Sequence, residues 1–66
     1  MKWKRARKKP VVIRFREPIG EIEKVETLEG LVIAHKGMHY IIEGVEGEIY
    51  PIAIPIFYKT FEVIEK

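Results

Sequence analysis

The sequence of 66 residues contains no cysteine, and serine, aspartate, asparagine and glutamine are also absent. Without cysteine the chain can form neither a disulfide nor a zinc site with thiolate ligands. The commonest nucleophile sets of covalent catalysis are missing too, because they need serine, cysteine or aspartate. We therefore expect a protein that is not an enzyme and holds no cofactor. The lack of thermolabile amides beside ten glutamates also favours a thermophilic source.

The short chain allows one domain with one core. A domain of this size buries only about 60% of the surface that its unfolded chain exposes, so its stability is marginal unless something supplements it. Because disulfides and thiolate metal sites are excluded, the supplement still open is oligomerisation. We expect a homo-oligomer or a partner protein.

Positive charge is concentrated at the start of the chain. Residues 2–9 carry six basic side chains and no acidic one, whereas the remainder has six basic against ten acidic residues, a balance of −4. The sequence thus predicts a basic N-terminal arm over residues 1–9 and a single acidic domain over residues 10–66. Such a charge pattern bears on partners rather than on fold.

The arm could be mistaken for the charged start of a signal peptide. The apolar stretch after it covers only residues 10–13 and is interrupted by Arg14 and Arg16. That stretch is too short for an exported segment, and no run approaches the length of a membrane span. We expect a cytoplasmic protein with no membrane contact.

Alternating polarity and turn residues predict five or six short strands. The least certain segment is residues 21–28, where Ile22, Val25 and Leu28 recur at a spacing that also fits a short helix; we favour a strand with an irregularity near Glu23 and Lys24. Pro51 indicates an edge strand or a bulge. The strands are expected at residues 11–16, 21–28, 31–35, 39–43, 48–53 and 60–64.

Few residues remain for helix, apart from a single helical turn between Pro55 and Lys59. The expected class is therefore all-β in the main. A small curled antiparallel sheet and a partly open SH3-like barrel are the two architectures that suit so short a chain.

Four stretches of the sequence together resemble a family of small phage and prophage proteins of unknown function, named for a Pro-Gly-Asp-Tyr-Gly-like signature. They follow the family's order and cover most of the chain. The most specific runs from Tyr40 to Pro51, in the letters YIIEGVEGEIYP. The other three are RKKPVVI at residues 7–13, TLEG at residues 27–30 and IFYKTFE at residues 56–62.

The chain departs from this family at three places. Gly37-Met38-His39 replaces the Pro-Gly-Asp of the signature, residues 17–20 are all that remains of a longer segment, and Ala53-Ile54-Pro55 replaces polar residues. The resemblance implies a phage-like accessory protein and supplies no catalytic residue.

Two histidines are weak candidates for a metal site. His35 and His39 flank one predicted turn, and Glu43 on the following strand is a possible third ligand. A stable site wants three or four ligands with further supporting contacts, and a spacing of four residues is weak by itself. The alternative is that these are ordinary turn and surface histidines, and we expect no metal.

The basic arm is the sharpest functional feature. Clustered Lys and Arg side chains release counterions from phosphates, and an interleaved Trp can stack on a base. Such an arm would bind many nucleic-acid sequences alike. The alternatives are an arm that lies on its own acidic body, one that only aids solubility, and one whose last residues begin the first strand. The candidate nucleic-acid contacts are Lys2, Trp3, Lys4, Arg5, Arg7, Lys8 and Lys9.

A second candidate surface is the uncharged run at residues 49–58. A strand buried on one face needs only alternate apolar positions, so the remaining ones must be covered or exposed. The alternative is that the run crosses the core and packs on both sides. The candidate interface residues are Tyr50, Ile52, Ile54, Ile56, Phe57 and Tyr58.

The leading interpretation is a non-catalytic interaction module, and the alternative is a nucleic-acid-binding protein that acts through its arm.

Overall fold

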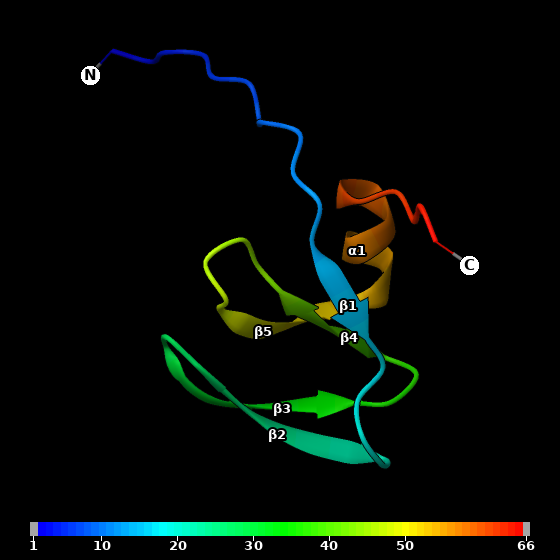
Figure 1. Ribbon diagram of the computed structural model, residues 1–66. Helices are drawn as coiled ribbons and strands as arrows, with labels where there is room; N and C mark the ends of the chain where they lie inside the picture. The colour runs from blue at the N-terminus through cyan, green and yellow to red at the C-terminus, as the bar shows by residue number, and fades with distance from the viewer. Residues whose placement is uncertain (1, 66) are drawn as a thin grey trace.

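Two antiparallel sheets and one helix are stacked as three layers in the computed structural model, which describes residues 2–65 (Figure 1). A hairpin of β2 and β3 forms one outer layer, the sheet β1-β4-β5 forms the middle layer, and α1 forms the other outer layer. The elements are β1 (Arg14–Arg16), β2 (Ile22–Thr27), β3 (Gly30–His35), β4 (His39–Glu43), β5 (Ile49–Ala53) and α1 (Ile54–Thr60).

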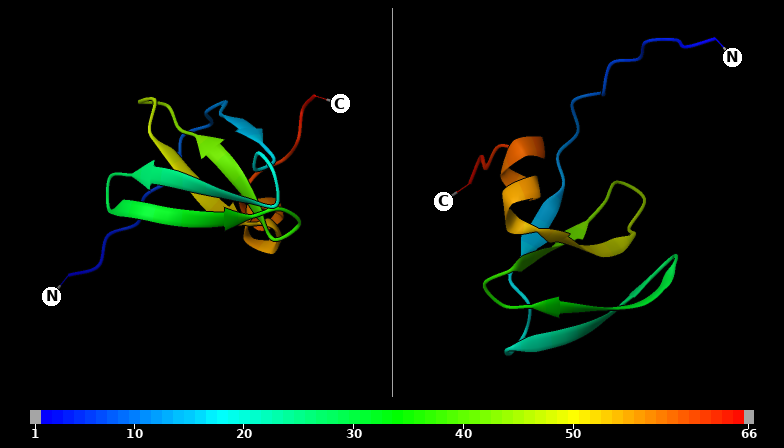
Figure 2. Two further views of the ribbon diagram at one scale, coloured as in Figure 1. Left: turned by 90° about the horizontal axis from the view of Figure 1, so that it is seen from below. Right: turned by 180° about the vertical axis from the view of Figure 1, so that it is seen from behind.

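The predicted class is confirmed, because strands with one short helix make up the domain. The sheets do not close into a barrel, and the two further views show the hairpin lying across the open face of the middle sheet (Figure 2). Met1 and Lys66, at the ends of the predicted arm and domain, lie outside the described residues.

The middle sheet separates two apolar layers because side chains alternate along its strands. Register pairs Phe15 with Ile42 and Ile42 with Tyr50, so these three share the face toward α1. Ile41 belongs to the opposite face, toward the hairpin, where it packs with Val25 and is only 2% exposed.

The layer between hairpin and sheet is small. Val25 and Ala34 come from the hairpin and Ile41 from the sheet, and Ile49 packs against them. Ala34 is 0% exposed, so the two layers approach closely at this position. The hairpin is therefore held by few side chains, as expected for so short a chain.

The layer between sheet and helix is aromatic. Phe57 of α1 is 1% exposed, and its ring centroid lies 4.6 Å from that of Phe15 and 5.0 Å from that of Tyr40. Phe61, just after the helix, adds a ring 5.3 Å away. Such ring pairs stabilise beyond the apolar area they bury. Phe57 is thus the central side chain of this layer.

The predicted helical turn is confirmed and is slightly longer than expected. Pro55 lies in the first turn, where its missing N–H costs nothing. The N–H of Ile54 donates to the carbonyl oxygen of Met38, and the helix ends where the N–H of Phe61 donates to the carbonyl oxygen of Phe57.

The strand expected at residues 60–64 is wrong. Thr60 belongs to α1, and Phe61 is turned toward the aromatic layer, while residues 61–65 form no strand. Alternating polarity is the only feature of residues 60–64 that indicates a strand. Alternation makes a strand only where another strand lies alongside.

The first strand is shorter than the predicted residues 11–16. Register pairs Arg14 with Glu43, so the preceding residue would have to pair with Gly44. The chain turns there, and the N–H of Gly44 donates to the carbonyl oxygen of Glu48. β1 therefore has no partner beyond Arg14.

The ambiguous segment at residues 21–28 is a strand, as favoured. The expected irregularity near Glu23 is wrong, because the register runs without interruption from Ile22–His35 to Thr27–Gly30. The turn that follows uses Gly30 at a φ of 112°, a conformation that L side chains rarely adopt. The hydroxyl of Thr27 supports the turn by donating to the carbonyl oxygen of Gly30.

Pro51 lies on an edge strand, as predicted, since β5 pairs only with β4. Hydrogen bonds from Gly44 to Glu48 and from Ile54 to Met38 fix which residues of β5 bond to β4. Because bonded and non-bonded pairs alternate, the nitrogen of Pro51 points away from β4. The ladder loses no hydrogen bond at this proline.

One ion pair connects the middle sheet to the hairpin. Arg16 of β1 donates two hydrogen bonds of 2.8 Å to the carboxylate of Glu23, which also accepts the N–H of Ile19. These contacts lower the pKa of Glu23 from 4.5 to about 2. The charged form is favoured in the folded state, so Glu23 stabilises the fold most above its ordinary pKa.

We expect this contribution to disappear as the pH falls from about 5 to about 2. The Glu23→Gln variant should lose stability at neutral pH and show a flatter decline in acid, because its side chain cannot titrate. Part of the slope should remain, since Arg14 also lowers the pKa of Glu43. Urea unfolding across this pH range measures the effect. Glu26→Gln is the control, and an unchanged slope for Glu23→Gln would contradict the assignment.

Candidate interaction surfaces

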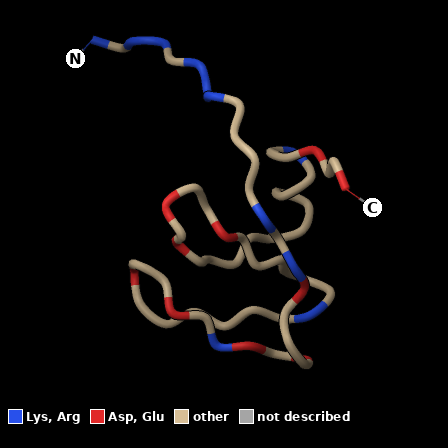
Figure 3. The backbone as a smooth tube through the Cα atoms, viewed as in Figure 1, with Lys and Arg blue, Asp and Glu red and all other residues tan. Residues whose placement is uncertain are grey.

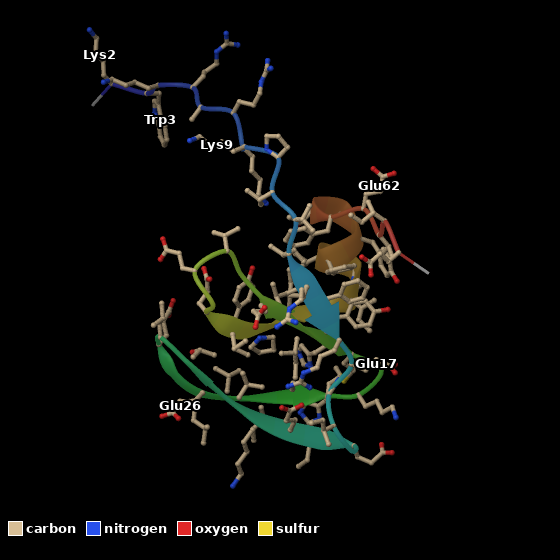
Figure 4. The ribbon with its side chains drawn as sticks, in the orientation of Figure 1. Lys2, Trp3, Lys9, Glu17, Glu26 and Glu62 are labelled. Carbon is tan, nitrogen blue, oxygen red and sulfur yellow. The ribbon has the colours of Figure 1, made fainter. Side chains whose placement is uncertain are left out.

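The basic arm extends away from the body of the protein (Figures 1 and 4). Residues 2–9 are all exposed and form neither helix nor strand. Trp3 is 89% exposed and hangs from the arm at a distance from the three layers. The structure thus places the candidate nucleic-acid contacts together on one segment, with their charges in water.

The base of the arm touches the C-terminal segment. The Lys8 Nζ atom lies 5.0 Å from the centroid of the Phe61 ring, a cation–π contact. Residues 8–15 and 60–65 line a groove of about 690 Å³ between the two segments. The two segments do not pair with each other as strands, and within residues 2–65 no other strand lies between them.

The predicted interface residues do not form one exposed surface. Phe57 is 1% exposed and belongs to the aromatic layer, so it is not available to a partner. Tyr50, Ile52 and Ile54 are half-buried, and only Ile56 and Tyr58 stand largely in water, at 54% and 56% exposure. The run at residues 49–58 is an edge strand followed by a helix that packs on the sheet.

Exposed apolar side chains gather instead on the outer face of the hairpin. Register pairs place Ile22, Leu31 and Ile33 on the face opposite Val25 and Ala34. Their exposed fractions are 55%, 63% and 45%. We call these three side chains the hairpin face. Lys24 and Glu26 share this face, opposite Ile33 and Leu31, and no other element covers it within residues 2–65.

The sequence carries one signal for the hairpin face. Residues 31–34 are four consecutive apolar residues, Leu-Val-Ile-Ala. A strand in a two-layer packing buries one face, so half of such a run must be exposed or covered by something else.

The hairpin also has an unpaired edge at β3. The N–H of Lys36 donates to the carbonyl oxygen of Glu21, which makes Ile22–His35 the first pair without ladder hydrogen bonds. By alternation, the backbone groups of Leu31 and Ile33 point away from β2. Those of His35 are occupied, because its N–H donates to His39 Nδ1 and its carbonyl oxygen accepts the N–H of Met38.

The three candidate metal ligands are not assembled. His35 and His39 lie close, with ring centroids 5.9 Å apart, but the Nδ1 atom of His39 is an acceptor for a backbone N–H. Glu43 is at the other end of β4, where its carboxylate binds Arg14 at 2.6 Å. No group of three metal-ligating side chains occurs within residues 2–65. The hydrogen bond between the His35 N–H and the His39 ring closes the β3–β4 turn.

The ionisable groups with shifted pKa values have structural explanations. Tyr40 has a raised pKa because its hydroxyl shares a 3.0 Å hydrogen bond with that of Tyr58. Arg14 and Arg16 have raised pKa values because each binds a glutamate. Tyr40–Tyr58 joins the sheet to the helix, Arg16–Glu23 joins it to the hairpin, and Arg14–Glu43 joins two strands of the middle sheet.

Acidic side chains without such partners gather at one end of the molecule. Glu26 and Glu29 lie at the tip of the hairpin, and Glu46 and Glu48 lie in the β4–β5 connection, which is at the same end (Figure 3). Between these two loops is a cleft of about 350 Å³. Its apolar lining includes Leu28, Val32, Ile49 and Pro51, and Glu29 and Glu48 also line it.

Fold and surface together define a small antiparallel β domain that carries an exposed basic arm. No family model matches this chain, and neither a curated protein nor a solved structure matches it. Within residues 2–65, the helix is too short to cross a membrane. The resemblance to the phage-type family therefore stays a prediction.

Proposed function

We propose that this chain is a non-catalytic interaction module, a phage-like accessory protein that associates with a second copy of itself through the hairpin face. The observation that carries the proposal is the position of Ile22, Leu31 and Ile33, three largely exposed apolar side chains on one uncovered face. Exposed apolar side chains that gather on one face of a small domain are typical of an interaction site.

The free edge of β3 supports the same proposal. Antiparallel pairing with β3 of a second copy would extend the hairpin to four strands and satisfy the free backbone groups of Leu31 and Ile33. It would also place these side chains from both copies in one row. A two-fold contact of this kind uses the same patch on both partners. A domain with so small a core gains stability from such a contact.

We expect the protein to sediment as a dimer at tens of micromolar, and Leu31→Glu to weaken the dimer at least about tenfold. The new carboxylate would lose its water in the interface without gaining a partner. Sedimentation velocity measures the association, and circular dichroism shows whether the variant is folded. Ile64→Glu is the matched control, because Ile64 is 71% exposed on the C-terminal segment. A wild-type protein that stays monomeric would overturn the proposal.

A second candidate function is nucleic-acid binding through the arm. It is favoured by the exposure of residues 2–9, which leaves Trp3 and the basic side chains other than Lys8 free to contact a phosphate backbone. The arm includes no element that could read bases in a groove. Binding would therefore depend on charge rather than on sequence.

For this candidate we expect duplex DNA affinity to fall about 10³-fold between roughly 50 and 200 mM salt if all six charges contact phosphates. Reversing three arm charges, Lys4→Glu, Arg5→Glu and Arg7→Glu, should abolish binding. The control reverses three charges of the body, at Lys24, Lys36 and Lys59, and changes the net charge equally. Fluorescence anisotropy of labelled DNA measures both. No binding at low salt would exclude this function.

A further inference from the structure

We propose that the cleft between the hairpin tip and the β4–β5 connection is a binding site for a basic peptide segment with an aromatic anchor, and that its occupant is the arm of a second copy of this chain. The site is separate from the hairpin face, so it adds a second contact to the proposed self-association.

The cleft offers an apolar floor with an acidic rim. Its volume of about 350 Å³ is at the small end of the range for ligand pockets, a size suited to a single large side chain. Val32, Ile49 and Pro51 supply apolar surface, and Leu28 at the hairpin tip is 93% exposed beside them. A side chain so exposed at a cleft's margin is available to cover an inserted ring.

The rim carries charge that no basic side chain within residues 2–65 neutralises through an ion pair. Only Arg14 and Arg16 form ion pairs within residues 2–65, and they bind Glu43 and Glu23. Glu29 and Glu48 line the cleft on opposite sides, one from each loop. The Glu48 carboxylate is held in place by the N–H of Glu46, which donates a hydrogen bond of 2.9 Å to it.

The arm has the complementary chemistry. Lys2 and Lys4 flank Trp3, so an aromatic ring lies between two positive charges. Indole is among the side chains that most often anchor an interface, because it buries a large apolar area. With the ring in the cleft, the two lysines would lie beside the glutamates of the rim. Charge complementarity of this kind steers association and fixes its register.

A second copy is the source that the structure favours. The arm leaves its own body and extends into solvent (Figures 1 and 2). Its charge is opposite to that of the body from which it projects, and every copy carries both the arm and the cleft. Exchange of arms between two copies would satisfy both sites at once.

The experiment uses the chain's single tryptophan as the reporter. Emission from Trp3 of the full-length protein is recorded over a range of concentrations beside sedimentation. We expect emission typical of an indole in water at low concentration, and a shift to shorter wavelength that follows dimer formation as concentration rises. Added salt should reverse the shift, because the rim contacts are charged.

Variants separate this site from the hairpin face. Glu29→Lys should raise the concentration of half-maximal shift roughly tenfold, since a rim attraction becomes a repulsion. Glu17→Lys is the matched control, because it makes the same change on the far side of the molecule (Figure 4). Trp3→Ala should weaken the dimer seen by sedimentation at least about tenfold if the ring is an anchor.

Each other outcome overturns the proposal in a recognisable way. A short-wavelength emission that does not depend on concentration would show that the arm binds its own body. A dimer whose Trp3 emission stays that of a solvated indole, and which Leu31→Glu disrupts, would leave the hairpin face standing and remove the cleft. A shift that arises only after duplex DNA is added would assign the arm to nucleic acid. A monomer at every concentration would remove both contacts.

Discussion

Phe57→Ala is expected to cost about 3–5 kcal/mol of the free energy of unfolding, the usual range for removing a fully buried aromatic ring. Phe57 is 1% exposed, and its ring lies against those of Phe15, Tyr40 and Phe61. The total stability of a chain of this length is on the order of 3–10 kcal/mol. A large fraction of the variant should therefore be unfolded at 25 °C.

The matched control for this change is Ile56→Ala on the same helix. Ile56 is 54% exposed, so its truncation opens no cavity, and alanine favours helix. Urea unfolding followed by circular dichroism measures both variants. Trp3 emission is unsuitable as the probe, because Trp3 lies on the arm rather than in the core. Equal stabilities for the two variants would show that the helix does not pack on the sheet as described.

Ala34→Leu has the second largest expected effect, a loss of about 1–3 kcal/mol from overpacking. Ala34 is 0% exposed where the hairpin crosses the middle sheet, beside Val25 and Ile41. A larger side chain would push the two layers apart. A two-stranded hairpin is at best marginally stable in water without such packing, so the hairpin should open before the rest of the domain.

Hydrogen exchange of the variant tests this order of opening. Amide protons of β2 and β3 should lose protection, while those of β4 and α1 keep most of theirs. Ala6→Leu makes the same chemical change on the exposed arm and should alter neither stability nor exchange. Uniform loss of protection across the domain would mean that hairpin and sheet unfold as one unit.

Much of the fold could be predicted because turn residues and alternation are local properties. Gly30 and Gly37 both have positive φ angles at turns, and β3, the strand between them, lies where expected. Pro51 correctly indicated an edge, since proline cannot donate in a ladder. What could not be predicted depends on partners distant in sequence. Residues 11–13 and 60–64 alternate like strands, but no strand lies beside them to complete a ladder.

The candidate surfaces were predicted less well for a related reason. Hydrophobicity alone does not say which side of a strand meets the core. Phe57 stands in the longest uncharged run and is the most deeply packed ring, whereas Leu31 stands in a shorter run and is 63% exposed. The cleft at the hairpin tip is lined by residues 27–29, Val32 and residues 48–51, which no motif connects. The basic arm could be predicted because its six charges are neighbours in the sequence, whatever fold the rest of the chain adopts.

The edge proline also limits how many copies could join through their sheets. Its nitrogen points outward at the middle of β5 and offers no donor to an incoming strand, so the middle sheet resists further strand addition on that side. In the proposed dimer, two copies related by a two-fold axis would use up each other's β3 edge. Fibrous polymerisation through β5 is therefore disfavoured.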